Sequence, residues 1–228
     1  MITTNATINL ERKISDTLFL LSVKIERYKE WIPGMFMQIS LEPKTASEPW
    51  LESRAFSFAN WGNEKAFILV RREGNFTRNL VEKAMKGFKT SVRYPFGYFL
   101  LNSNHDKVFL SGGTGVSVFL SYLDYINSKN RENERVLFFH STKSVDETLR
   151  KFYWNTIPSN ICLQEFITDG GSNKYTGRMK FECLQSHIKN FSAYDYYICG
   201  PPQFSLYWSE KLKSLGIISN LEQWVNKG

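Results

Sequence analysis

A glycine-rich turn that leads into an amphipathic segment is the first feature of this sequence that could do chemistry. The apolar run 107–110 is followed by Ser-Gly-Gly-Thr-Gly at 111–115, and a helix is predicted from Val116 to Asn127. The backbone N–H groups of such a turn and the N-terminus of the next helix converge on one spot, which suits a phosphate. The spacing is neither G-x-G-x-x-G nor that of a P-loop, so a purely structural turn is the alternative.

A second segment, residues 54–59, alternates a guanidinium and aromatic rings with small side chains. The two-residue period of a strand places Arg54, Phe56 and Phe58 on one face and Ser57 on the other. A guanidinium fork matches phosphate geometry, and aromatic rings suit flat ligands. For Arg54 the alternative is a surface ion pair, and for Phe56 it is a ring in the core.

Composition indicates a folded protein and argues against several classes. The chain has 228 residues, of which 42% are hydrophobic and 22% charged, enough for one large domain or two small ones. The formal charge of +7 is dispersed, which favours a solvated lysine-rich surface over a nucleic-acid partner. Three scattered cysteines argue against a disulfide framework or a metal site. Because no apolar window reaches membrane-spanning length and the N-terminus lacks a secretion signal, we expect a cytoplasmic protein without a membrane partner.

The pattern of predicted secondary structure around these residues changes near residue 102. Before it, β-rich runs at 16–25, 36–41 and 66–71 and one helix at 77–85 predict an antiparallel β-barrel. After it, strands alternate with helices, which predicts a doubly wound parallel α/β domain. The strands expected there are 108–110, 135–140, 161–167 and 194–199, and the helices are 116–127, 146–154 and 202–215.

Segment 54–57 resembles the Arg-x-(Tyr/Phe)-Ser flavin-binding element of the ferredoxin-NADP reductase superfamily. Other elements of that superfamily recur in the same order. They are Pro33-Gly34-Met35-Phe36, Gly74-Asn75-Phe76-Thr77, Tyr94-Pro95-Phe96-Gly97-Tyr98-Phe99 with Tyr94 in place of a glycine, the turn at 111–115, and Cys199-Gly200-Pro201-Pro202-Gln203-Phe204. Each is short, but together they span nearly the whole chain. The resemblance implies an FAD-binding β-barrel domain at 1–102 and an NAD(P)-binding α/β domain at 103–228.

The resemblance also assigns roles in the flavin domain. Arg54 would hold a flavin phosphate, Phe56 would lie on the isoalloxazine ring, and Ser57 would hydrogen-bond near the flavin N5 atom. Thr77 and the amides from Gly74 onward would hold the FAD pyrophosphate, which is compatible with an ordinary helix cap at Thr77. Ile68 and Val70 would line the flavin, and Arg71 would be a second phosphate ligand. Asn75 and Phe76 belong to the turn that would hold the FAD phosphates. For Ile68 and Val70 the alternative is core packing, and for Arg71 it is an exposed charge.

In the second domain, Gly112, Gly113, Thr114 and Gly115 would face the nicotinamide dinucleotide. Cys199 ends a predicted parallel strand, where such sheets bind ligands, and would lie beside the nicotinamide carbon that donates hydride. A small buried core residue is the alternative for Cys199. Gly200 and Pro201 would shape the turn after it. Ser57 and Cys199 are thus the expected catalytic residues, and proximity of the two cofactors would supply most of the rate.

One segment departs from the superfamily pattern. His140-Ser141-Thr142-Lys143 stands where Tyr/Phe-Gly-x-Arg is usual, which weakens the expected contact with the adenosine side of the nucleotide. We therefore expect no preference for NADP, and NAD binding is less secure than flavin binding.

Two segments resemble one branch, which includes the electron-transfer subunit of dihydroorotate dehydrogenase. They are 167–177, with its Thr-Asp-Gly-Gly-Ser, and 219–224. That branch carries a [2Fe-2S] cluster just afterwards, but this chain has three cysteines, so no cluster is expected. Trp224 would cover the flavin, or would simply pack.

The sequence therefore predicts an FAD-dependent NAD(P)H oxidoreductase that acts as an electron-transfer subunit in a hetero-oligomer. A partner subunit of the dihydroorotate dehydrogenase type, and with it a place in pyrimidine biosynthesis, is favoured. The alternatives are an FAD subunit that no longer uses NAD(P)H, a stand-alone NAD(P)H-flavin or ferredoxin reductase, and a non-enzymatic nucleic-acid-binding protein.

Overall fold

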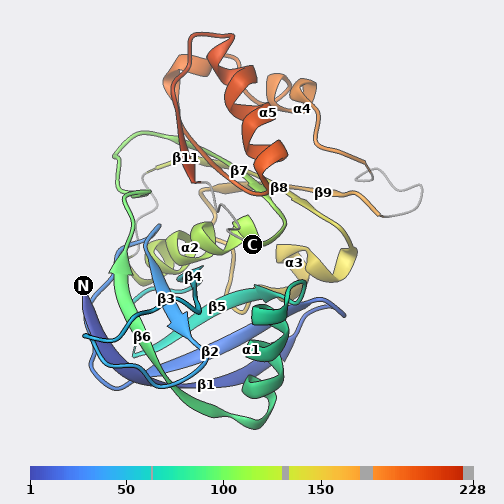
Figure 1. Ribbon diagram of the computed structural model, residues 1–228. Helices are drawn as coiled ribbons and strands as arrows, with labels where there is room; N and C mark the ends of the chain where they lie inside the picture. Colours follow the sequence, from blue (N-terminus) through green and yellow to red (C-terminus); the bar gives the residue numbers. More distant parts are fainter. Residues whose placement is uncertain (63, 130–133, 170–176, 223–228) are drawn as a thin grey trace. The chain divides into compact units, whose positions relative to one another are not determined.

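The computed structural model describes residues 1–62, 64–129, 134–169 and 177–222. The chain folds as two compact units (Figure 1). The first comprises Met1–Leu101 with Ser117–Tyr125, and the second comprises Asn102–Val116 with Ile126–Gly228. The division into an FAD domain and an NAD(P) domain near residue 102 stays a prediction. Among the described residues, no helix combines the length and the apolar content that crossing a membrane requires.

The first unit is built on a six-stranded antiparallel sheet in the order β4-β3-β6-β1-β2-β5. Its strands are β1 (Ile2–Lys13), β2 (Leu18–Ile25), β3 (Phe36–Ser40), β4 (Ser53–Ser57), β5 (Lys65–Arg71) and β6 (Phe88–Phe96). Just after β4, the amide of Ala59 donates to the Phe67 carbonyl of β5 at 2.8 Å. The two edge strands therefore meet and the sheet closes on itself, which confirms the predicted barrel.

An aromatic cluster fills one end of this barrel. Trp31 and Phe58 stack with ring centroids 4.2 Å apart, and Tyr94 meets both rings edge-on. The Tyr94 hydroxyl donates to the Arg27 carbonyl and accepts from the Lys29 amide, both at 2.7 Å. The side chain of Tyr94 therefore fixes the loop after β2 to the core.

Helix α1 (Asn75–Lys86) is the one helix predicted in the first half. Its buried residues are Leu80, Val81 and Ala84, the apolar face that its sequence predicts. It begins two residues before the expected start, because the Thr77 hydroxyl accepts from the Gly74 amide at 3.2 Å and organises the first turn.

The second unit contains a five-stranded parallel sheet in the order β11-β10-β7-β8-β9, which confirms the predicted α/β class. Its strands are β7 (Lys107–Gly112), β8 (Val136–Thr142), β9 (Ile161–Ile167), β10 (Asp195–Cys199) and β11 (Ser219–Glu222). Its helices are α2 (Ser117–Lys129, of which residues 117–125 group with the first unit), α3 (Leu149–Phe152), α4 (Phe181–Gln185) and α5 (Pro202–Lys213), with 3₁₀ turns at Gly113–Val116, Val145–Glu147 and Phe191–Ala193.

Helices cover both faces of this sheet. Leu184 of α4 and Trp208 and Leu212 of α5 pack on one face, and Figure 1 shows α3 on the other. The single helix expected at 146–154 is instead a 3₁₀ turn followed by α3, because Thr148 is extended and interrupts it. The Glu165 carboxylate then accepts the Leu149 amide at 2.5 Å and supports the new start.

The backbones of two loops approach each other closely at the carboxyl edge of this sheet. A Cβ atom on Gly115 would lie 2.3 Å from the carbonyl oxygen of Cys199, nearer than non-bonded atoms come. By contrast, a Cβ on Gly113 would meet nothing within 4 Å, although its φ of +54° is left-handed. The tight contact at Gly115 thus holds the turn after β7 against the end of β10.

Replacing Gly115 by alanine is expected to lower the free energy of unfolding by about 3 kcal/mol or more, since backbone must move to admit the methyl group. Gly113→Ala is the matched control and is expected to cost about 1 kcal/mol, for its left-handed backbone alone. Urea unfolding followed by circular dichroism measures both. Equal losses in the two variants would contradict the close approach.

Candidate functional site

The register between β3 and β4 sets which side chains of 54–57 share a face. Arg54 pairs with Ile39 and Phe56 with Met37, and both partners are core residues. Ser57 pairs with Phe36 on the opposite face. The alternation predicted from the sequence is therefore present.

The first turn of α1 meets β4 through aromatic contacts. The Arg54 guanidinium carbon lies 5.4 Å from the centroid of the Phe76 ring, and the rings of Phe56 and Phe76 are 6.4 Å apart and 27° from parallel. Arg54 is exposed while both rings are half-buried. The structure therefore brings a cation and two flat rings together beside a helix start, as holding a phosphate and a planar ring requires.

The N-terminus of α1 is open to an anion. Gly74 and Asn75 are exposed, and the first turn contains no acidic residue. The first amides of a helix lack partners within it, and its dipole favours negative charge there. Phe76 and Thr77 are half-buried in the same turn, so the predicted pyrophosphate residues 74–77 lie next to Arg54 through Phe76.

Ser57 carries an unsatisfied polar atom. It is only 4% exposed, and its Oγ has no hydrogen-bond partner among the described residues. Leaving a buried hydroxyl unpaired costs about 1–3 kcal/mol, so such an atom calls for an explanation. A ligand atom that pairs with it is one, and the residues present thus fit a flavin whose N5 edge approaches this hydroxyl.

The three remaining residues from β5 divide into two groups. Ile68 and Val70 lie in the barrel core with about 0–1% of their surface exposed, so their side chains pack inside and only their backbone can reach a ligand outside β5. Arg71 faces the other way, and its guanidinium donates to the Thr17 hydroxyl at 2.9 Å. The core packing given as the alternative for Ile68 and Val70 is what the structure shows.

In the second unit, the residues predicted to bind a nucleotide gather at the carboxyl edge of the parallel sheet. A Cβ on Gly112 would lie 3.1 Å from side-chain atoms of Pro201 and Phe204, and one on Gly200 would lie 2.7 Å from the Phe204 ring. The turn after β7 and the turn after β10 are therefore packed closely, so that a Cβ atom at either glycine would require its neighbours to shift. Gly113 and Thr114, in the turn after β7, are half-exposed.

Cys199 ends β10 at this edge and is fully buried. It pairs with Ser111 of β7 on one side and with Glu222 of β11 on the other. Parallel sheets place ligands at their carboxyl edge, so the position agrees with the expected one.

Glu222 was not selected from the sequence, yet it lies beside Cys199 on β11. Burial raises its pKa to about 7. The signal that could have found it is a carboxylate at the end of a short polar strand, but β11 is too short and too polar to be predicted.

Some predictions fall outside the described residues. These are Trp224 and residues 170–176. Within the described ranges, no three His, Cys, Asp or Glu side chains gather as a metal site would require.

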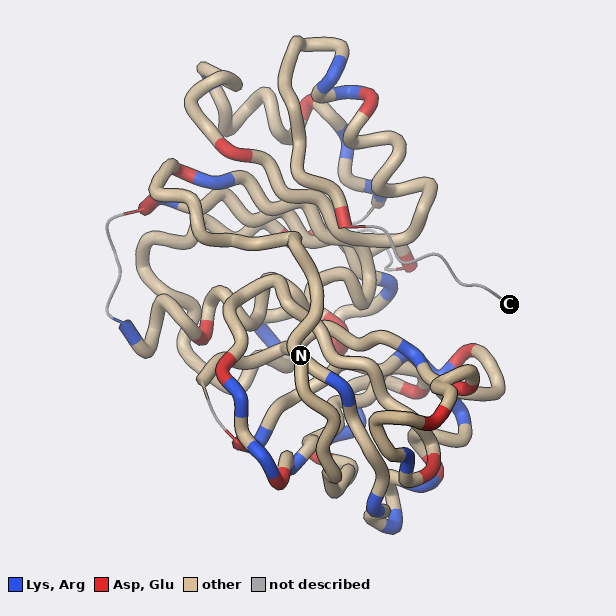
Figure 2. Tube along the Cα trace, turned by 60° about the vertical axis from the view of Figure 1, so that its left-hand side comes forward, with Lys and Arg blue, Asp and Glu red and all other residues tan. Residues whose placement is uncertain are grey.

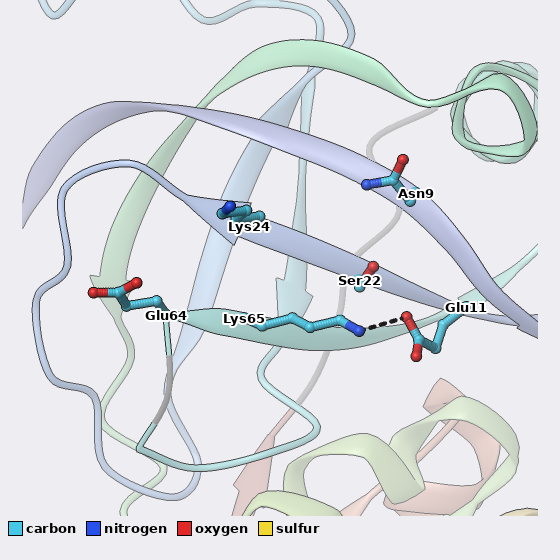
Figure 3. A pocket seen from close by; sticks show the side chains of 6 residues that line it. All are labelled: Asn9, Glu11, Ser22, Lys24, Glu64 and Lys65. Carbon is cyan, nitrogen blue, oxygen red and sulfur yellow. Dashed lines mark ion pairs between the residues drawn. The ribbon is translucent and has the colours of Figure 1, made fainter.

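The surface depression of the first unit lies away from the residues predicted to bind a cofactor. A shallow depression of about 510 Å³ on the outer face of β1, β2 and β5 contains the Lys65–Glu11 ion pair, 2.9 Å long (Figure 3). It shares no residue with the predicted sites. Figure 2 shows Lys and Arg interspersed with Asp and Glu along the described trace, as the dispersed charge of the sequence indicates.

Comparison with known proteins finds similarity to flavin- and NAD-dependent reductases. Residues 109–209 match the oxidoreductase NAD-binding domain model. A subunit of the Na⁺-translocating NADH-quinone reductase of Serratia proteamaculans is 22% identical over 72% of this chain and 46% of its own length. The electron transfer component of anthranilate 1,2-dioxygenase of Acinetobacter baylyi is 26% identical over 83% of this chain and 57% of its own length. The chain thus spans about half the length of these relatives.

Two solved structures share the whole fold. The FAD/NAD-binding domain of nitric oxide dioxygenase from Vibrio cholerae has a TM-score of 0.77 at 19% identity and covers 97% of this chain and 99% of its own. A ferredoxin NADP⁺ reductase from Neisseria gonorrhoeae with bound FAD and NADP has a TM-score of 0.75 at 17% identity and covers 99% and 94%. The chain therefore has the fold of these two structures, and its residues 109–209 match the oxidoreductase NAD-binding domain model.

Proposed function

We propose that this chain is a flavin-dependent NADH oxidoreductase module that passes electrons to a separate protein. The observation that carries the proposal is the buried, unpaired Ser57 hydroxyl on the same strand as Arg54 and Phe56. The relatives support the direction of electron flow, since one is named a subunit of an NADH-quinone reductase and another an electron transfer component.

Each unit would hold one cofactor by its own residues. Arg54 and the amides of residues 74–77 would bind the FAD phosphates, Phe56 would support the ring, and Ser57 would hydrogen-bond to it. Ile68 and Val70 would contribute backbone only. In the second unit, Gly113, Thr114 and Gly115 would bind the nucleotide phosphates, with Cys199, Gly200 and Pro201 closing the site. Bound FAD supplies the chemistry, because it takes up a hydride and releases electrons singly or in pairs.

The choice of electron acceptor is based on two segments of the sequence. The segments 167–177 and 219–224 favour a partner of the dihydroorotate dehydrogenase type, and part of both lies outside the described residues. The relatives found are named for other acceptors, a quinone and a dioxygenase. We propose a protein partner in a hetero-oligomer, with the dihydroorotate dehydrogenase type and a cytoplasmic location as predictions from the sequence.

Anaerobic titration of the FAD-loaded chain with NADH tests the function. We expect the flavin absorbance near 450 nm to bleach with about one equivalent of NADH, since hydride transfer reduces one flavin. NADPH is the comparison, and a weaker response is expected because an arginine usual for the superfamily is absent at Lys143. A flavin that dithionite bleaches but NADH does not would favour the alternative of an FAD subunit that no longer uses NAD(P)H.

Ser57→Ala separates a ligand-binding hydroxyl from a structural one. Without FAD, the variant is expected to gain about 1 kcal/mol of stability, because an unpaired buried polar atom is removed. With FAD, the stabilisation that the cofactor confers is expected to shrink by about the same amount. Thermal unfolding with and without FAD measures both.

Ser53→Ala on the same strand is the control for this experiment. The Ser53 hydroxyl donates to the Trp50 carbonyl at 2.5 Å and accepts from Gln38 at 2.6 Å, so its loss should destabilise the protein without FAD. A Ser57→Ala variant that behaves like Ser53→Ala would contradict the assigned role.

Glu222 predicts a pH dependence of stability. Its pKa is raised from 4.5 to about 7 in the folded protein, so the stability that its proton contributes is complete below about pH 4.5 and is lost as the pH rises through 7. Glu222→Gln is therefore expected to raise the melting temperature at pH 8.5 and to leave it unchanged at pH 4.5. The exposed Glu210→Gln on α5 serves as the control. An equal effect of Glu222→Gln at both pH values would refute the assignment.

A further inference from the structure

A row of polar side chains crosses three strands at the carboxyl edge of the parallel sheet. Ser111 of β7 pairs with His140 of β8, which in turn pairs with Glu165 of β9. Residues paired across parallel strands point to the same face. All three are buried, with 0%, 1% and 7% of their surfaces exposed. Burying polar groups at this depth costs free energy unless they are hydrogen-bonded, so the bonds that the row makes matter to the structure around it.

The central contact of the row joins β7 to β8. The Ser111 Oγ and the His140 Nδ1 are 2.8 Å apart, and either atom donates according to the tautomer of the imidazole. The ring of His140 lies 6.5 Å from that of Phe138, which in turn contacts Phe109 edge-on. Packing against these rings restricts the orientation of the imidazole.

The two ends of the row reach different loops. Ser111 is followed directly by Gly112 and Gly113, which have no side chains to fix the turn. At the other end, the Glu165 carboxylate accepts the amides of Leu149 and Arg150 at 2.5 and 3.5 Å, where α3 starts. The hydroxyl of Ser111 is therefore the last side-chain anchor before the turn that would bind the nucleotide.

A hydrolytic serine–histidine–carboxylate triad does not account for the row. A nucleophilic serine must reach substrate, and Ser111 has no exposed surface. In a triad the carboxylate orients the histidine ring, whereas here the Glu165 oxygens are engaged by backbone amides of α3.

We propose that His140 is a positioning residue that fixes the glycine turn 112–115 for pyridine-nucleotide binding through its hydrogen bond to Ser111. This inference rests on the proposed function for the identity of the ligand. It also gives a role to the segment in which the sequence departs from the superfamily pattern: His140 supplies a side-chain anchor from the neighbouring strand.

Two substitutions at His140 separate the hydrogen bond from the ring. His140→Phe keeps a ring but loses the bond to Ser111, whereas His140→Asn loses the ring but keeps a polar amide near the position of Nδ1. Ser111→Ala removes the bond from the other side. Because the two residues act through one contact, the double variant Ser111→Ala/His140→Phe should be no worse than either single change.

The first measurement is hydrogen exchange at the amides of residues 112–116 in the chain without ligand. We expect exchange to be about tenfold faster in His140→Phe and Ser111→Ala, and close to wild type in His140→Asn. His105→Phe, at an exposed histidine of the same unit, is the control and should change nothing. Unchanged exchange in His140→Phe would overturn the proposal whatever the protein binds.

The second measurement is NADH reduction of the FAD-loaded variants. We expect KM for NADH to rise about tenfold in His140→Phe with kcat within about twofold, and recovery in His140→Asn. Loss of thermal stability with an unchanged KM would show a merely structural role and overturn the proposal. If the wild type binds no NADH, the proposed function fails and the nucleotide assignment of this inference fails with it, a result that the exchange experiment distinguishes from failure of the anchor.

Discussion

The pairing of β4 with β3 is the constraint on which the proposed flavin site of the first unit depends. A shift by one residue would turn every side chain of a strand to the other face. In the observed register Phe56 lies opposite Met37, so the core holds the strand at one position, and Ser57 is left on the other face with its hydroxyl unpaired. The core therefore offsets the cost of leaving this hydroxyl unpaired, and the proposed flavin would pair with it.

The second unit depends on close backbone approach in place of side-chain register. Gly112, Gly115 and Gly200 let the turns after β7 and β10 come together, and at Gly115 a Cβ atom would lie only 2.3 Å from the backbone oxygen of Cys199. Glycine provides this proximity but leaves the turns without side-chain anchors. The buried Ser111–His140 contact and the end of β10 at Cys199 supply the missing constraints from neighbouring strands.

Much of the architecture follows from local pattern. Short β-rich runs predicted β2, β3 and β5, and the apolar face of α1 predicted that helix. The interruption at Thr148 was missed, since it depends on the distant carboxylate of Glu165.

The site was predicted less completely than the fold. Motif order proposed Arg54, Ser57 and the glycine turn, which stay predictions, but it could not show that Ile68 and Val70 point into the core, because both faces of a barrel strand can be apolar. Glu222 was missed, as its importance comes from pairing with Cys199 across the sheet. Long-range pairing is the information that local sequence does not carry.

Calorimetric titration of the chain with FAD tests the central claim, which is that the first unit binds a flavin through β4 and the start of α1. The account predicts one FAD per chain with a dissociation constant on the order of 1 μM or tighter, and a tenfold to hundredfold weaker constant, about 1.4–2.7 kcal/mol, for Arg54→Ala but not for the exposed Arg27→Ala. Folded protein that binds neither FAD nor FMN would contradict it.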